Sequence, residues 1–415
     1  MFQRSIRALQ SKNCTARLSF QSPRSVVSLA GSGNRTASTT MSTICILEPT
    51  HWGRFQGGAE IQSHFLANHI ADKTNHTVVY LSRFIPDDVS TYRYKILQYQ
   101  GPRLLRHLRW GQTGDSISIY QQLRRIDPDV ILQMQAGAYV GAGAFYAKRN
   151  NKPFVWYIAS DRDLEANPPV GTESPFKHLD QRFFQYGIHN ADYIIAQTKF
   201  QERMLLTNLD RRAVAVVPNF HPVPDVVEKS EPPLIVSWIA NLKPLKRPQL
   251  FAKLAEAFKD RSDVSFMMAG RSDDSVESRQ AIETLGSLPN GKYLGELTLD
   301  EVNSLLEKSH VLINTSEYEG FPNTFVQAWL RSVPTLSINV DPDDIMSTHS
   351  IGKMSGSLEG LVDDLQELTT DGELRISSGN RARNFSVENF SLDNAAKVVG
   401  ILEGAIHHGK IQRPL

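Results

Sequence analysis

One segment of the chain combines a carboxylate, a glycine turn and a helix start. It reads Ser316-Glu317-Tyr318-Glu319-Gly320-Phe321-Pro322-Asn323-Thr324-Phe325 and follows a short apolar run at 311–314. Glycine and proline would shape the turn, and the backbone amides of 323–325 would open a helix. Such amides attract phosphate, while the Glu319 carboxylate can accept hydrogen bonds from sugar hydroxyls. The segment therefore suits a sugar diphosphate; an ordinary capped helix is the alternative and explains fewer of its residues.

Two further places carry residues that could contact a ligand. Gly57-Gly58-Ala59-Glu60 lies between an apolar run and a helical stretch, where bare backbone lets a ligand approach helix amides. A plain loop is an equally good interpretation of this pair. Ser160-Asp161-Arg162-Asp163 follows an apolar run that ends near Ile158. Ligands bind beyond the carboxyl ends of parallel strands, so Asp161 is a candidate site residue, with helix capping as the alternative.

The elements that must position these residues follow a βα rhythm from Ile44 onward. Strands are expected at 44–47, 77–81, 130–134, 154–158, 193–196 and 213–217, with a first helix at 59–73. A proline-rich stretch at 218–233 interrupts the rhythm. The rhythm then restarts, with strands at 234–239, 264–269, 311–314 and 335–337 and helices at 248–259, 300–308 and 324–331.

This rhythm predicts an α/β protein with two Rossmann-like lobes that face a central cleft. We expect an extension at 1–42, a first lobe at 43–222, a linker at 223–233, a second lobe at 234–390 and a tail at 391–415. A final amphipathic helix at 392–406 could cross back to pack on the first lobe.

The run EGFPNTFVQAW at 319–329 resembles the signature of the retaining family 4 (group 1) glycosyltransferases, which have the GT-B fold. Other pieces agree in order and spacing: the glycine pair at 57–58, ADYIIAQT, VVPNF, WIANLKPLKRPQLF and the strands before Gly270 and Gly295. The similarity extends from Ile44 to the C-terminus. This ordered set is far more specific than any single motif.

The resemblance implies roles for individual residues. Glu319 would hold hydroxyls of the transferred sugar, Lys246 would contact the donor pyrophosphate, and Asp161 would lie beside the sugar. Donor contacts are expected from Gly57, Gly58, Asn241, Arg247, Gly320, Phe321, Pro322, Asn323, Thr324 and Gln327.

Two positions depart from the family pattern. The second glutamate, which usually holds the ribose, is Gln327 here, and its amide still offers one acceptor oxygen. The usual arginine five residues before the lysine is Asn241, and Arg247 or Arg271 could compensate. A DRD triplet at 161–163 also resembles the metal-binding DxD of unrelated single-lobe glycosyltransferases, but the two-lobe pattern argues against that assignment.

The implied activity is transfer of a hexose-type sugar from a nucleoside diphosphate sugar to a hydroxyl of a saccharide or lipid-linked acceptor. The anomeric configuration would be retained, without a metal or cofactor, in polysaccharide or glycoconjugate synthesis, with a bacterial setting implied. Two alternatives remain: a non-catalytic nucleotide-sugar-binding subunit, and a sugar-nucleotide epimerase of the same architecture. Turnover separates the first from an enzyme, and release of a modified donor without an acceptor identifies the second.

The composition limits the classes of binding partner and the cellular compartment that we expect. Forty-five basic residues balance 44 acidic ones, so no global charge favours nucleic acid. Two cysteines and no long apolar stretch fit a reducing, cytoplasmic protein. The basic segment 92–110 has leucines at helical spacing and is either a solvated helix or a peripheral membrane contact. The first 40 residues are rich in Arg and Ser without acids; we expect translation to start at Met41, with an organellar transit peptide as the alternative.

Overall fold

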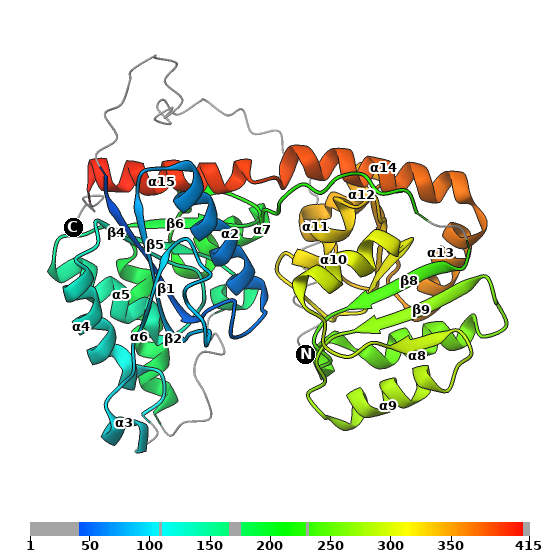
Figure 1. The fold of residues 1–415 in the computed structure, drawn as a ribbon, viewed down its shortest axis with the longest axis horizontal. Helices are drawn as coiled ribbons and strands as arrows, with labels where there is room; N and C mark the ends of the chain where they lie inside the picture. Colours follow the sequence, from blue (N-terminus) through cyan, green and yellow to red (C-terminus); the bar gives the residue numbers. More distant parts are fainter. Residues whose placement is uncertain (1–40, 108–109, 166–175, 230–231, 410–415) are drawn as a thin grey trace, which may run out of the picture. The chain divides into compact units, whose positions relative to one another are not determined.

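The computed structural model describes residues 41–107, 110–165, 176–229 and 232–409, which contain two parallel sheets covered by helices (Figure 1). Residues 1–40 of the extension expected at 1–42 lie outside the described residues. The two sheets confirm the prediction of two Rossmann-like α/β lobes.

The first lobe is built on a sheet with seven described strands, all parallel, in the order β3-β2-β1-β4-β5-β6-β7. The strand order reverses between β1 and β4, which is where doubly wound sheets open a ligand crevice. Residues along β1 alternate between two cores: Ile44 and Ile46 join one, Cys45 and Leu47 the other. The strands are β1 Thr43–Thr50, β2 Thr77–Phe84, β3 Lys95–Gln98, β4 Val130–Gln133, β5 Phe154–Tyr157, β6 Tyr193–Ala196 and β7 Ala215–Val216.

The second lobe repeats this design with six described parallel strands in the order β10-β9-β8-β11-β12-β13. Here the order reverses between β8 and β11, so the carboxyl ends of these two strands form the second expected crevice. The strands are β8 Leu234–Ile239, β9 Val264–Ala269, β10 Gly291–Tyr293, β11 Val311–Asn314, β12 Thr335–Ser337 and β13 Gly352–Met354.

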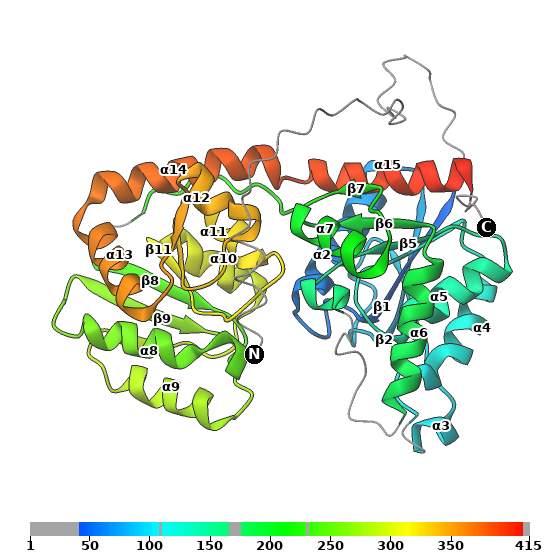
Figure 2. The ribbon, with the colours of Figure 1, turned by 180° about the vertical axis from the view of Figure 1, so that it is seen from behind.

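Helices cover both faces of each sheet, and Figure 2 shows α5 and α6 side by side on the first lobe. The first lobe contains α2 Gly58–Lys73, α3 Arg103–His107, α4 Ser116–Ile126, α5 Ala138–Arg149, α6 Lys177–Asn190 and α7 Lys199–Leu209, with the 3₁₀ turns η1 Thr113–Asp115 and η2 Asp161–Leu164. The second contains α8 Pro248–Ala257, α9 Val276–Gly286, α10 Leu299–Lys308, α11 Asn323–Trp329, α12 Ile345–His349, α13 Leu358–Thr370 and α14 Gly372–Asn389, with η3 Pro244–Lys246 and η4 Pro342–Asp344.

The segment 92–110 is not the continuous helix that its leucine spacing suggested. Residues Lys95–Gln98 form strand β3, which pairs with β2, and among the described residues of this segment only Arg103–His107 are helical. Leu104 and Leu105 lie in this short helix, whereas β3 precedes the leucines with helical spacing. In the described part of the chain, no helix has both the length and the hydropathy needed to cross a bilayer.

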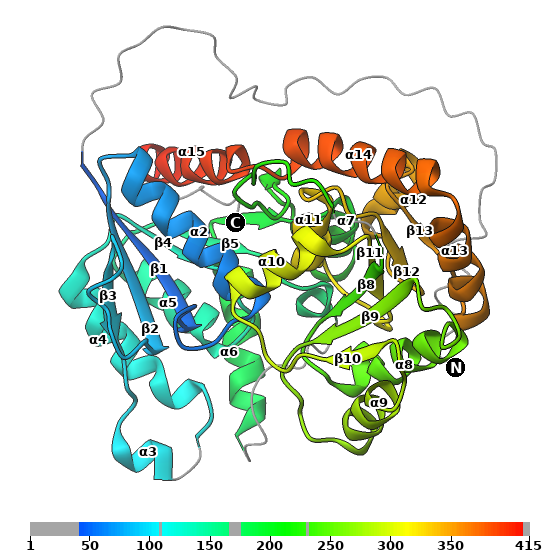
Figure 3. The same ribbon diagram turned by 45° about the vertical axis from the view of Figure 1, so that its right-hand side comes forward.

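The C-terminal helix α15, Asp393–His408, crosses back to the first lobe, as its amphipathic pattern predicted (Figure 3). It contacts α2 and β4, and Val398 and Leu402 are fully buried in the same core as Ile44 and Ile46 of β1. The end of the chain therefore completes the core of the lobe with which the described chain begins.

We expect Leu402→Ala to lower the free energy of unfolding by about 2–5 kcal/mol, because it leaves a cavity in this core. Gly400→Ala, two residues earlier on the same helix, is the control. Gly400 is exposed, and nothing lies within 4 Å of an added Cβ. That change should stabilise the helix by about 0.5–1 kcal/mol. Urea denaturation measures both, and equal stability of the two variants would contradict the packing role of α15.

Candidate active site

A cavity of about 450 Å³ lies at the carboxyl ends of the strands of both lobes. First-lobe residues on its wall include Trp52, Gln56, Ser160 and Gln197. Most of the predicted site residues also line it: Gly57, Gly58, Asn241, Lys246, Glu319, Gly320, Phe321, Pro322, Asn323, Thr324 and Gln327. The two predicted crevices therefore open into one cavity.

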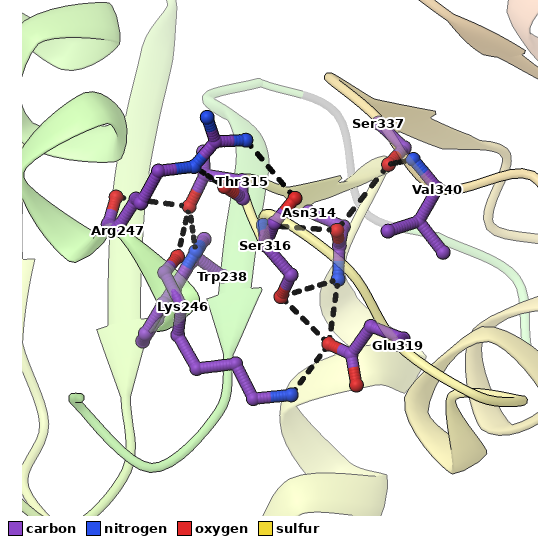
Figure 4. Close-up of polar contacts among 9 residues, drawn as sticks. All are labelled: Trp238, Lys246, Arg247, Asn314, Thr315, Ser316, Glu319, Ser337 and Val340. Carbon is purple, nitrogen blue, oxygen red and sulfur yellow. Dashed lines mark hydrogen bonds and ion pairs between the residues drawn. The ribbon is translucent and has the colours of Figure 1, made fainter. Parts of the chain in front are cut away.

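Glu319 lies in the loop between β11 and α11, and one of its oxygens is held by three donors (Figure 4). Its Oε1 lies 2.5 Å from Lys246 Nζ and accepts hydrogen bonds from Ser316 Oγ at 2.6 Å and Asn314 Nδ2 at 3.3 Å. Its Oε2 accepts no hydrogen bond from the described residues. The carboxylate is thus fixed in place with one oxygen left for a ligand.

The loop that carries Lys246 is tied to the end of β11 by a buried threonine. Thr315 Oγ1 is 2.6 Å from the carbonyl oxygen of Lys246 and 3.0 Å from that of Arg247. Trp238 Nε1 of β8 donates to the same hydroxyl at 2.9 Å (Figure 4). The loop of Lys246 is therefore anchored at the end of β11, and the Glu319 carboxylate is held by Ser316 and Asn314, which preorganises the pair.

Arg247 does not lie where the family resemblance suggested. Its guanidinium donates to the carbonyl oxygens of Thr315 at 2.6 Å and Ser316 at 3.0 Å, and it is absent from the cavity wall. Its backbone is left-handed, with φ of 49°, which turns the side chain away from the direction of Lys246. Arg247 supports the loop rather than facing a donor.

Asp161 is also placed away from the cavity wall, although its neighbour Ser160 lines it. Ser160 and Asp163 form a capping box at the start of η2, and this turn directs Asp161 toward α7. Asp161 Oδ1 accepts a hydrogen bond from Gln201 Nε2 at 2.9 Å, and burial raises the pKa of its carboxyl group to about 6. Capping in this segment falls to Ser160 and Asp163, not to Asp161.

The start of α11 offers fewer free amides than expected. The amide of Phe325 donates to the carbonyl oxygen of Pro322 at 3.1 Å, which leaves those of Asn323 and Thr324. The helix has only seven residues, so its dipole is smaller than that of a long helix. Side-chain charge must therefore contribute more of any attraction for phosphate.

Asn323 connects this helix to the first lobe. Its Oδ1 lies 2.7 Å from Gln62 Nε2 and 3.0 Å from His221 Nε2, and its Nδ2 donates to the Gly58 carbonyl oxygen at 3.1 Å. Burial lowers the pKa of His221 to about 4, so its ring is neutral near pH 7. This network joins the glycine pair to the loop that carries Glu319, and this role of Asn323 was not predicted from the sequence.

Some cavity residues were not predicted from the sequence as site residues. Trp52 and Glu296 belong to no recognisable motif, whereas Gln197 lies within the family-like run ADYIIAQT. Lys243 lies in the same loop as Lys246. Arg271, one of the two residues expected to compensate for Asn241, directly follows β9 and Gly270 and does line the cavity. The cavity thus contains three cationic side chains: Lys243, Lys246 and Arg271.

Two family models match consecutive parts of the chain. The model for glycosyl transferases group 1 matches residues 223–385, and the model for glycosyltransferase family 4 matches residues 56–222. Together they include both lobes and nearly all of the cavity wall. The chain belongs to the group 1 glycosyltransferases.

Two curated proteins are similar to about half of this group 1 glycosyltransferase. A poly(ribitol-phosphate) alpha-N-acetylglucosaminyltransferase of Staphylococcus aureus is 23% identical over 51% of this chain and 44% of its own length. An uncharacterized glycosyltransferase of Methanocaldococcus jannaschii is 24% identical over 49% of this chain and 57% of its own. The matches thus span about half the length of these relatives.

Solved structures resemble the group 1 glycosyltransferase over most of its length. Anabaena HepE in complex with UDP-glucose has a TM-score of 0.67 at 14% identity, with 88% of this chain and 100% of that chain aligned. A variant of S. aureus TarM, in complex with fondaparinux, alpha-GlcNAc-glycerol and UDP, has a TM-score of 0.69 at 13% identity, with 87% and 99% aligned. These likenesses show the shared GT-B fold.

Gln327 lies on the cavity wall, 4% exposed, and its Nε2 donates to Asn303 Oδ1 at 3.2 Å. It is part of α11, whereas Glu319 precedes the helix, so the two residues do not share a helix face.

We predict that Gln327→Leu weakens binding of a nucleoside diphosphate about tenfold, because the acceptor oxygen for the ribose is lost. Gln327→Glu, which restores the family residue, should bind at least as well as wild type. Calorimetry with UDP measures both, and an unchanged dissociation constant for Gln327→Leu would exclude a ribose contact.

Proposed function

We propose that this group 1 glycosyltransferase moves a hexose-type sugar from a nucleoside diphosphate sugar to an acceptor hydroxyl, with retention of anomeric configuration. The observation that carries this proposal is the Lys246–Glu319 pair, fixed at the ends of β8 and β11 on the wall of the cavity. A cation for phosphate and a carboxylate for sugar hydroxyls lie side by side there, as a sugar diphosphate requires.

We propose a uridine diphosphate sugar as the donor. The structures of HepE and TarM, which share the fold, contain UDP or UDP-glucose. The S. aureus relative is named for transfer of N-acetylglucosamine to poly(ribitol-phosphate), which supports a saccharide or polyol hydroxyl as acceptor in glycoconjugate synthesis.

The activity is tested by incubation with UDP-glucose or UDP-N-acetylglucosamine and a panel of saccharide and polyol phosphate acceptors. Acceptor-dependent release of UDP supports transfer. A modified sugar nucleotide formed without acceptor would indicate an epimerase, and binding without turnover would indicate a non-catalytic subunit.

In this reaction the protein mainly stabilises the negative charge that develops on the leaving diphosphate. Lys246 would neutralise negative charge that develops on the diphosphate as the glycosidic bond breaks. A diphosphate oxygen can then accept the proton of the acceptor hydroxyl on the face from which the diphosphate departs. Glu319 would hold hydroxyls of the sugar through its free Oε2, while Oε1 stays bound to Lys246, Ser316 and Asn314.

We predict that the product keeps the anomeric configuration of the donor and that transfer continues in excess EDTA. Cationic side chains would supply the charge that a divalent metal supplies elsewhere. Proton NMR of the anomeric coupling in donor and product follows both features in one reaction. An inverted product would contradict the retaining assignment, whereas retention that stops with EDTA would contradict only the metal-independence.

A further inference from the structure

Arg271 differs from Lys246, because its charge has no partner in the described chain. Lys246 is paired with Glu319, whereas the Arg271 side chain makes no ion pair or hydrogen bond with any described residue. Its guanidinium carbon lies 4.9 Å from the ring centroid of Phe55, which comes from the first lobe. An unpaired cation on a cavity wall raises the local concentration of anionic ligands.

The register of β8 and β9 places Arg271 directly beside Asn241. Ile239 pairs with Ala269, and beyond the strand ends Leu242 still pairs with Ser272 in a parallel bridge. The amide of Leu242 donates to the carbonyl oxygen of Arg271 at 2.8 Å. The same register therefore sets residues 241 and 271 opposite each other, and both line the cavity.

Gly270 allows the two segments to lie this close together. Its φ is 143°, and an added Cβ would lie 1.8 Å from the carbonyl oxygen of Ala240. Any other residue would therefore force the segment that carries Arg271 away from the segment that carries Asn241. The asparagine is short, so it leaves room for the longer guanidinium on the neighbouring segment.

We propose that Arg271 is the second cation for the donor diphosphate and replaces the arginine that the family usually has at position 241. This inference rests on the proposed function. A guanidinium can donate two parallel hydrogen bonds to phosphate oxygens, which a lysine cannot. The positive charge that the family usually has after β8 is thus supplied after the neighbouring strand β9, and it is not lost.

Phe55 acts as a positioning residue for this guanidinium. It belongs to the loop between β1 and α2 that also carries Trp52 and Gly57 on the cavity wall. A cation over an aromatic face is attracted to the ring and loses rotational freedom. The first lobe thereby contributes to diphosphate binding without supplying a charge of its own.

The test is calorimetry of wild type and variants with UDP and with uridine. Arg271→Ala should weaken UDP binding about tenfold or more, because charge-assisted hydrogen bonds to the diphosphate are lost. Uridine has no phosphate, so its affinity should not change.

Asn241→Arg in the Arg271→Ala background should recover most of the lost UDP affinity. Lys253→Ala, which removes the charge of an exposed lysine of α8 that does not line the cavity, is the matched control and should change UDP binding by less than about threefold. Phe55→Leu should weaken UDP binding less than Arg271→Ala does.

The outcomes separate this inference from the proposed function. If wild type binds UDP and Arg271→Ala binds it equally well, Arg271 is not the second cation and the proposed function still stands. An equal loss of uridine binding in Arg271→Ala, or failure of Asn241→Arg to recover UDP affinity, also overturns this inference. If wild type binds none of UDP, ADP or GDP, the donor class is wrong and the inference falls with it.

Discussion

Glu319→Gln is expected to lower kcat/KM about a hundredfold or more while leaving the fold intact, because it removes a preorganised charge at the reacting sugar. The glutamine has nearly the same shape, so Ser316 and Asn314 keep a neighbour to hydrogen-bond. The charge that balances Lys246 is lost, and the Lys246 side chain is only 21% exposed. The melting temperature should therefore fall, and circular dichroism at the assay temperature checks that the variant is still folded.

Glu317→Gln is the matched control for this experiment. Glu317 lies two residues earlier in the same loop, is exposed and does not line the cavity. Its replacement should leave kcat/KM within about twofold of wild type, as expected for a surface substitution. Similar activity in Glu319→Gln and Glu317→Gln would contradict the assignment of Glu319 to the site.

Lys246→Met should produce the second large effect, a fall in kcat/KM of about a hundredfold or more, because the leaving diphosphate loses its nearest cation. Methionine keeps most of the aliphatic length, so packing along the side chain is preserved. UDP binding should also weaken, whereas in Glu319→Gln the sugar contact is lost and UDP binding should be nearly unchanged. The two variants thus test the contact to the diphosphate and the contact to the sugar separately.

Lys253→Met, an exposed lysine on α8, controls for a general loss of positive charge. A double variant of Lys246 and Glu319 tests whether the pair acts as a unit. Residues in direct contact show strongly non-additive effects, so the double variant should be little slower than the slower single variant. Fully additive losses of activity would mean that the two residues act independently.

Much of this site could be predicted from the sequence, because strand ends in parallel sheets meet at one edge. The short apolar runs before Asn241 and Glu319 identified two strand ends, and the family resemblance implied that Lys246 and Glu319 each contact the donor. The amphipathic spacing of 392–406 likewise predicted a helix with one buried face. These features depend on local periodicity and chain order, which a sequence shows directly.

Tertiary structure alone decided where the individual polar side chains point. A left-handed residue turns Arg247 onto backbone carbonyl groups, and the capping box at Ser160 turns Asp161 toward Gln201. The pairing of β8 with β9 sets Arg271 beside Asn241, although thirty positions separate them in the chain. Sequence spacing fixes which residues lie at a strand end, but side-chain direction and register depend on backbone dihedrals and long-range hydrogen bonds, which form only when the lobes fold.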